Sequence, residues 1–211
     1  MAQNIIKEKE LDIKRELIIR NILNELESNN AYITNTKDNF FREFDYVNRL
    51  LNNSLTKKKI KEYRKNYSPL NPFFSVVSFR PSRSIYNSLV SDGSFNFIES
   101  PKLKALIDDV YKLNYNSILN IIELEKEVAI EADRFFVNNH SEVYVQNFWF
   151  NFNDDKLINN VFKIMQNDNH FKALMVQKIS YMEIKTSALD EYSKKRDALI
   201  KLLKNKLNLN I

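Results

Sequence analysis

Hydrophobic residues recur at helical spacing over most of this chain. In residues 4–53 they return in steps of three, four and seven, with neither proline nor glycine between them. This period is typical of a helix that packs in a bundle or a coiled coil. The sequence predicts one continuous helix of roughly 70 Å, with a break near residues 28–30 as the alternative, because asparagine is a weak helix former. Its apolar positions are Leu11, Ile18, Ile22, Leu26, Ile33, Phe40, Phe44, Val47 and Leu51, and Leu17, Ile19 and Leu23 widen the stripe.

Two further stretches carry the same period, at residues 101–137 and 170–207. Core candidates include Leu113 and Leu124 in the first of them. The predicted fold is therefore all-α, an elongated antiparallel bundle of three long helices with short connecting helices. The apolar run at residues 73–79 is too short for its period to separate a strand from a buried helical turn. We expect at most a minor strand element.

Helix-breaking residues are concentrated in residues 78–101, which hold the only glycine and two of the four prolines. Proline is tolerated in the first turn of a helix, serine caps its free N–H groups, and glycine ends it in the left-handed conformation. The stretch predicts a short helix that opens at Pro81 or Ser82 and closes at Gly93. The apolar face of this helix is formed by Ile85, Tyr86, Leu89 and Val90. Ile98 then turns inward, and Ser100 with Pro101 predicts the start of the next helix.

Two local runs suggest binding, and each has a structural alternative. The aromatic run at residues 143–152 contains Phe148, Trp149 and Phe150, which fit a ligand or partner surface, but also a hydrophobic plug at the end of a bundle. A basic run near residue 60 fits nucleic acid or anionic lipid, but also a solvated helical turn with Tyr63 and Tyr67 packed inward. We favour the structural interpretation of both. The basic residues are Lys57, Lys58, Lys59 and Lys61.

Composition narrows the classes of protein. A chain of 211 residues, 44% hydrophobic, fits a single domain spanning residues 1–211. Its 32 basic and 27 acidic side chains describe an interleaved surface, so nucleic acid is a poor partner. One glycine argues against a glycine-rich phosphate loop, and the lack of cysteine excludes disulfides and thiolate metal sites. No apolar run approaches the roughly 18–20 residues of a membrane span.

Candidate catalytic groups are few, and we predict a non-enzymatic protein without a cofactor. No nucleophile elbow or metalloprotease motif is present. His140 and His170 stand in asparagine-rich breaks and fit surface loops better than metal ligation or general-base catalysis. Acidic residues along the second long stretch fit a solvated helix face better than a carboxylate metal site, because neither histidine follows a glutamate at the required spacing. These residues are Asp108, Asp109, Glu123, Glu125, Glu127 and Glu131.

The pattern from Phe79 to Tyr111 resembles an uncharacterised family of bacterial single-pass membrane proteins. The resemblance is carried by Phe79-Arg80-Pro81, by residues 85–89, by Gly93 with Phe97-Ile98, and by residues 103–111. It implies one N-terminal transmembrane helix ahead of residue 1 and a helical soluble domain on the outer face of the cytoplasmic membrane. Asn4 and the charged residues after it resemble the exit from that span. The resemblance implies no catalytic residues.

Three hypotheses about function follow. The first is a membrane-anchored helical interaction or scaffold module whose partner is a protein, either a second copy or another chain. The second is a ligand-sensing bundle with a pocket near residues 73–98 or 143–152. The third is a nucleic-acid-binding domain that uses the basic run, with an affinity that falls as salt rises. We rank them in this order.

Overall fold

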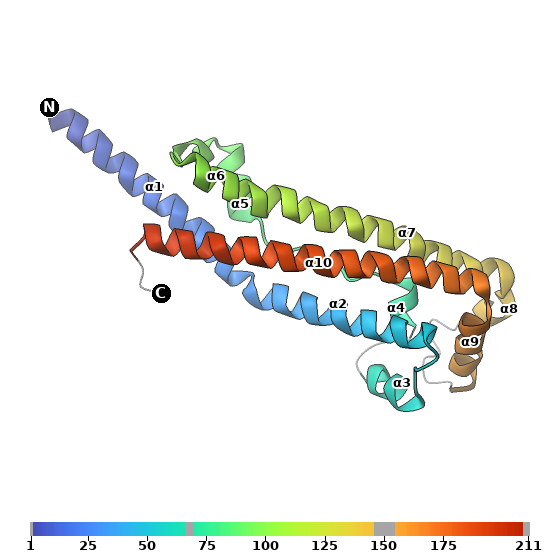
Figure 1. Ribbon diagram of the computed structural model, residues 1–211. Helices are drawn as coiled ribbons and strands as arrows, with labels where there is room; N and C mark the ends of the chain where they lie inside the picture. Colours follow the sequence, from blue (N-terminus) through green and yellow to red (C-terminus); the bar gives the residue numbers. More distant parts are fainter. Residues whose placement is uncertain (1, 66–69, 146–154, 209–211) are drawn as a thin grey trace. The chain divides into compact units, whose positions relative to one another are not determined.

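The computed structural model describes residues 2–65, 70–145 and 155–208, and these ranges contain helices and no strand (Figure 1). The all-α prediction is confirmed, and the run at residues 73–79 forms the end of a short helix and a non-helical segment. The helices are α1 (Ala2–Ser28), α2 (Asn30–Leu51), α3 (Lys57–Arg64), α4 (Asn71–Phe74), α5 (Ser84–Ser91), η1 (Ser94–Phe97), α6 (Pro101–Asp108), η2 (Asp109–Asn114), α7 (Tyr115–Asn139), α8 (Ser141–Val145), α9 (Asp155–Asn167) and α10 (Asn169–Lys206).

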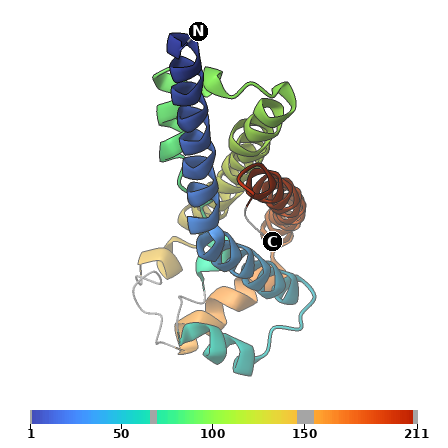
Figure 2. The same cartoon turned by 90° about the vertical axis from the view of Figure 1, so that its left-hand side faces the viewer.

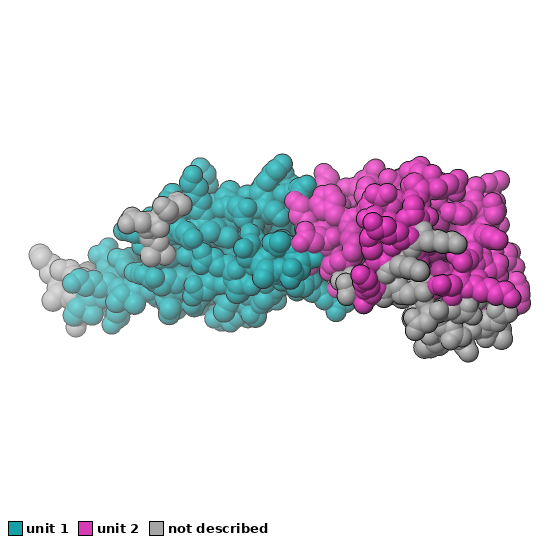
Figure 3. All heavy atoms as spheres, turned by 90° about the horizontal axis from the view of Figure 1, so that it is seen from below, with its two compact units in different colours: residues 1–35, 79–118, 188–211 teal, residues 36–78, 119–187 magenta. Residues whose placement is uncertain are grey.

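The chain divides into two compact units, coloured separately in Figure 3. Unit 1 comprises residues 1–35, 79–118 and 188–211, and unit 2 comprises residues 36–78 and 119–187. Each unit is thus built from segments that lie far apart in the sequence. The single-domain expectation stays a prediction.

The first long helix is not continuous, because Asn29 separates α1 from α2. The Asn29 side chain pairs with the backbone of Ser82: its Nδ2 donates to the Ser82 carbonyl at 2.9 Å, and its Oδ1 accepts from the Ser82 N–H at 2.8 Å. Asparagine is a weak helix former whose amide competes for backbone groups. The preferred prediction of one helix over residues 4–53 is therefore wrong at this point, and the alternative break holds.

The second long stretch runs as α6, the π-helix η2 and α7. A π turn holds more residues than an α turn, so it changes which side chains face inward. Leu113, within η2, is 63% exposed, and Leu124 is 43% exposed beside the buried Glu125. Both were predicted as core residues, and that is wrong. Leu113 lies in the π turn, and Leu124 is next to the position of α7 that faces inward, which Glu125 occupies. The last helix, predicted at residues 170–207, is confirmed as α10.

The core of unit 1 centres on aromatic rings. Phe79 is buried, and the centroid of its ring lies 5.1 Å from that of Tyr192 and 5.8 Å from that of Tyr115. The rings of Tyr86 and Tyr111 stack at 4.7 Å, and the Tyr86 hydroxyl donates to Asp108 at 2.7 Å. Aromatic pairs of this kind add to the free energy gained by burial. They join the segment after residue 78 to α6, η2 and α10.

The short predicted helix is present as α5, but it begins at Ser84 rather than at Pro81 or Ser82. Pro81, Tyr86, Leu89 and Ile98 are buried, whereas Val90, placed on the same apolar face, is 50% exposed. Gly93 has a φ of 75°, in the left-handed region expected after a helix. The next helix starts as predicted. Pro101 opens α6, and the N–H of Leu103 donates to Ser100 Oγ at 3.3 Å.

In unit 2 the residues of α2, α7 and α10 surround a core that also takes in α4 and α9, and α10 runs antiparallel to the other two long helices (Figures 1 and 2). Phe73 of α4 lies 5.8 Å from Tyr46 and 6.1 Å from Phe162, measured between ring centroids. Phe74 lies 5.6 Å from Phe136 in the same way. A single turn of helix thus carries two rings into the centre of the unit.

We expect Gly93→Ala to lower the free energy of unfolding by about 1 kcal/mol, because an L-residue with a side chain pays a steric cost at positive φ. A Cβ at this position meets no atom within 4 Å, so the cost is conformational rather than steric crowding by neighbours. Gly93→Asn should cost less, since asparagine tolerates the left-handed region. Chemical denaturation measures both. Equal stability of the alanine variant and the parent would contradict the assignment.

Candidate functional site

Four charged side chains meet inside unit 2, and we call them the buried charged cluster: Glu43, Glu125, Lys178 and Lys185. Glu125, Lys178 and Lys185 are each 0% exposed and Glu43 is 6% exposed. They come from three helices, α2, α7 and α10. Charged residues are almost never fully buried unless they are paired, so this cluster is the least expected feature of the core.

Each member occupies a place where a hydrophobic residue is the rule. In α10 the buried positions follow steps of four and three through Phe171, Met175, Lys178, Met182 and Lys185. Such steps define the seam of a packed helix. Glu125 in α7 and Glu43 in α2 stand at the equivalent positions between buried apolar neighbours. The charges therefore interrupt the seams of all three helices.

The contacts centre on Glu125. Its Oε2 accepts a short hydrogen bond from Lys185 Nζ, and its Oε1 lies 3.6 Å from Lys178 Nζ. Lys178 Nζ also donates to the backbone carbonyl of Ser75 at 2.7 Å. Lys185 Nζ lies 4.1 Å from the centroid of the Phe40 ring, a cation–π distance. The lysines thus connect α10 to α7, to α2 and to the segment after α4.

The environment shifts proton affinities within the cluster. Burial raises the pKa of Glu43 to about 7, against the opposing charges of Lys178 and Lys185, while the negative charge of Glu125 raises it further. The charge of Arg42 also acts to lower this pKa. Burial lowers the pKa of the Lys178 amine, although Glu125 and Glu43 oppose this shift. Because all four side chains are buried, we interpret the cluster as a structural, proton-sensitive element.

The sequence contained a signal for this cluster that our prediction did not use. Glu125 was expected on a solvated acidic face, and that is wrong, because the seam spacing of α7 turns it inward. Lys178 and Lys185 were not singled out in the sequence analysis. A lysine seven residues after another lysine, both in the seam register of Met175 and Met182, indicates a buried pair.

A second polar site lies in unit 1, where Glu25 of α1 caps α5. Its Oε1 accepts from the Ile85 N–H at 2.8 Å and from the hydroxyls of Ser82 and Ser84 at 3.1 Å each. Its Oε2 lies 3.3 Å from the Tyr86 N–H. A carboxylate at a helix N-terminus satisfies free N–H groups and complements the helix dipole. The cap therefore comes from another helix and not from the serine predicted to supply it.

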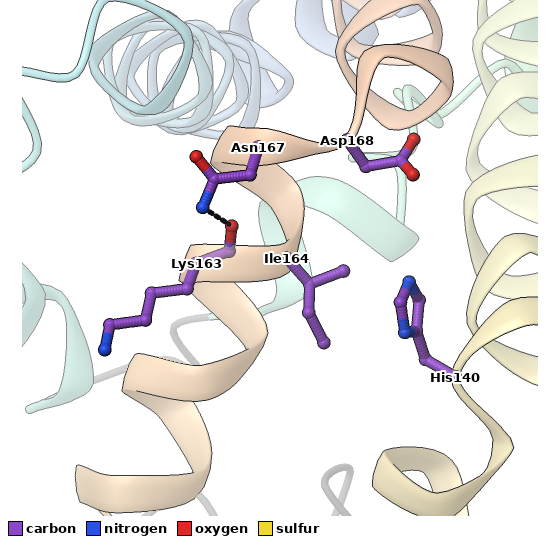
Figure 4. A pocket seen from close by; sticks show the side chains of 5 residues that line it. All are labelled: His140, Lys163, Ile164, Asn167 and Asp168. Atoms are coloured by element: carbon purple, nitrogen blue, oxygen red, sulfur yellow. Dashed lines mark hydrogen bonds between the residues drawn. The ribbon is translucent and has the colours of Figure 1, made fainter.

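An open hollow of about 350 Å³ lies in unit 2, between the end of α7 and the end of α9 (Figure 4). In this view the side chains of His140 and Ile164 face each other, Asp168 lies above them, and Lys163 points away. The remaining lining residue, Asn167, donates to the Lys163 carbonyl at 2.8 Å. Asp168 Oδ1 accepts the N–H of Phe171 at 2.9 Å and so caps α10. Asn167 and Asp168 thus have structural partners already.

The two histidines serve packing. The ring of His140 lies 5.3 Å from Phe135, and the ring of His170, in the first turn of α10, stacks on the same phenylalanine at 5.8 Å. Within the described residues, no group of three or more histidine, aspartate or glutamate side chains is arranged to hold a metal ion.

The exposed surface of α1 carries a third feature, an apolar stripe formed by Ile6, Ile13 and Leu17. Their exposed fractions are 57%, 69% and 56%. At 100° per residue the three fall within about 40° around the helix, while the buried Ile18 and Ile22 lie on the other side. We predicted Leu17 to widen the buried stripe, and that is wrong. Figure 1 shows the first turns of α1 reaching beyond α5 and α6.

Of the predicted binding residues, only the basic run lies within the described part of the chain. Lys57, Lys58, Lys59 and Lys61 lie on α3, where Lys58 and Lys59 are exposed and Tyr63 is buried as the structural interpretation required. Phe148, Trp149 and Phe150 lie outside the described residues, as does Tyr67. None of the helices in the described ranges combines the length and hydrophobicity that a membrane span needs.

We expect the free energy of unfolding to fall by about 3 kcal/mol between pH 4.5 and pH 8 through Glu43. Its folded pKa of about 7 lies above the ordinary value of 4.5, so the stabilisation is present below pH 4.5 and is lost as the pH rises through 7. Glu43→Gln should flatten this dependence and be the more stable protein at pH 8. Chemical denaturation across this pH range measures it, with the exposed Glu127→Gln as the matched control. An unchanged slope in Glu43→Gln would contradict the assignment.

A second prediction concerns the pairing. Glu125→Leu should destabilise the protein by about 3–5 kcal/mol, since it leaves two buried lysines without their carboxylate. Replacing Glu125 by Leu and both Lys178 and Lys185 by Met should restore most of that loss, because an apolar seam replaces the charges together. Glu123→Ala, at an exposed pair with Lys126, should change stability by about 1 kcal/mol or less. A single variant as stable as the parent would show that Glu125 does not hold the lysines.

We compared the chain with models of protein families, with curated proteins and with solved structures, and none of the three comparisons found a match. The resemblance to a bacterial single-pass membrane family, and the location on the outer face of the cytoplasmic membrane that it implies, stay predictions.

Proposed function

We propose that this chain is a helical protein-interaction module that binds its partner through the apolar stripe of α1. The observation that carries the proposal is the exposure of Ile6, Ile13 and Leu17 along one line of the helix. Helix α7 also carries three exposed large apolar side chains, Leu124, Ile130 and Val137, but at 100° per residue Leu124 lies more than 100° from the other two. Among the other described helices, α10 carries two and α2, α5 and η2 carry one each. Exposed apolar surface that is grouped rather than scattered marks interaction sites.

The surroundings of the stripe support the same function. Charged residues flank it on both sides, including Lys9, Glu10 and Glu16, all exposed. An apolar line with charged borders is the pattern with which helices recognise other helices. Arg15 and Lys14 hold α1 against the segment around η1: Arg15 pairs with Glu99, and Lys14 Nζ lies 3.9 Å from the Phe97 ring. The stripe is thereby presented on a helix fixed from its other side.

The alternative functions have weaker support. The hollow beside His140 lies outside the two regions where a sensing pocket was predicted, and Asp168 and Asn167 are occupied in capping and helix contacts. The basic run on α3 alternates with the acidic Glu62, which lies 3.7 Å from Lys59 Nζ. Ligand sensing and nucleic-acid binding stay predictions.

The test places a photoreactive amino acid at Leu17 or Ile13 in cells that make the protein, with Asp12 as the matched control. Asp12 is exposed on α1, off the stripe. We expect cross-links to protein from the two stripe positions and few from Asp12. Ile6→Lys should reduce the yield from Leu17 several-fold, because it removes apolar contact about three turns away without touching the probe. No protein cross-link from either stripe position would refute the proposal.

A further inference from the structure

The charges beside the stripe of α1 are arranged with opposite polarity on its two sides. Lys9 and Glu16 lie on one side and Glu10 and Lys14 on the other, each about 40–80° around the helix from the centre of the stripe. Within four positions of Asp12, the basic residue precedes the acidic one on the first side, and the acidic residue precedes the basic one on the second; Arg20 lies beyond Glu16 on the first side. All four side chains are exposed. A second copy of α1 in the antiparallel orientation therefore places opposite charges against each other.

We infer that the stripe binds the same stripe of a second copy of this chain, with the two α1 helices antiparallel and crossing near Asp12. The inference rests on the proposed function, because it names the partner of that surface. Reversing α1 about Asp12 sets Lys9 of one copy against Glu16 of the other, and Glu10 against Lys14. Ile6 then lies near Leu17 of the second copy, and the two Ile13 side chains meet close to the axis.

A parallel pair has different contacts. In parallel helices a flank residue faces the opposite flank about five positions later, which brings Lys9 of one copy against Lys14 of the other. Like charges at such positions oppose pairing, whereas the antiparallel arrangement repeats two attractive pairs by symmetry. The flank charges therefore select the antiparallel orientation, and the apolar stripe supplies the attraction.

The present contacts of Glu16 and Lys14 leave both side chains able to pair with the second copy. Glu16 pairs with Arg20 at 2.7 Å, with both side chains about half exposed, a contact that is readily given up. Lys14 Nζ lies over the Phe97 ring, and its three N–H donors can bind a carboxylate while the ammonium keeps that position. The opposite side of α1, with Ile18 and Ile22, remains buried against unit 1.

The orientation bears on the predicted membrane anchor. Antiparallel helices send their N-terminal ends in opposite directions. An anchor placed immediately before residue 1 in both copies would then require two facing membranes. A measured orientation therefore tests this part of the family resemblance as well as the pairing.

The first experiment is sedimentation velocity of the full chain from micromolar concentration to about 1 mM. We expect a monomer–dimer equilibrium that Leu17→Glu abolishes. Lys9→Glu and Glu16→Lys should each weaken the dimer about tenfold, and their equimolar mixture should recover the parent affinity, because each restores the pairs that the other lost. In a parallel dimer Lys9→Glu would face Lys14 and strengthen association. Circular dichroism confirms that each variant is folded.

The second experiment measures orientation. The chain has no cysteine, so Asn24→Cys provides one spin-labelling site per copy. Labels at this exposed position should lie about 36 Å apart in the antiparallel dimer and about 10 Å apart in a parallel one. A short distance, or a dimer strengthened by Lys9→Glu, overturns the antiparallel pairing.

The outcomes separate this inference from the proposed function. A chain that stays monomeric to about 1 mM, yet cross-links from Leu17 to another protein, refutes self-pairing and leaves the interaction module standing. A monomer without any stripe cross-link refutes both. A dimer that Leu17→Glu leaves unchanged uses another surface and also overturns the inference.

Discussion

The contact between Glu125 and the two lysines of α10 is the constraint on which unit 2 depends. Removing ions from water costs several kcal/mol for each, and only close pairing offsets that cost. With Lys178 and Lys185 fully buried, α10 cannot slide or rotate against α7 without separating charges inside the core. An apolar seam tolerates such shifts far better, because methionine and leucine are nearly interchangeable partners. The charges therefore specify the register of α2, α7 and α10, and the hydrophobic residues around them stabilise it.

Unit 1 uses a buried carboxylate for a different purpose. Glu25 also stands at a seam position of its helix, but its partners are N–H groups and hydroxyls at the start of α5. This carboxylate and the Asn29 amide, four residues later, both bind the segment around Ser82. One face of α1 and its end thus determine where α5 begins. The segment from Ser82 to Tyr86 is thus held by residues about 55 positions earlier in the chain, a contact that its local caps do not supply.

These two sites show what the sequence could and could not predict. Helical periods, Gly93 and Ser100-Pro101 are local signals, and they located most helices and two of their ends. The break at Asn29 and the start of α5 depend on a contact between distant segments, which no local pattern contains. The seam of α10 was visible as a spacing, but pairing Lys178 and Lys185 with Glu125 needs the identity of the neighbouring helix. The π-helix η2 likewise turns Leu113 outward, and no local sequence signal predicted it.

Buried charges and exposed apolar residues are treated differently in this protein. Two of the inward-facing carboxylates have close partners within their unit: Glu125 pairs with two lysines, and Glu25 accepts from backbone donors and hydroxyls. On α1 the situation is the opposite, because apolar side chains lie in solvent and charged side chains lie beside them. A helix whose buried face is already complete gains nothing for its own fold from Ile6, Ile13 and Leu17, since these side chains stay in water. Their grouping on one line, bordered by charges of alternating sign, gains free energy only when a second surface covers them. That is the physical ground for proposing α1 as the interaction surface.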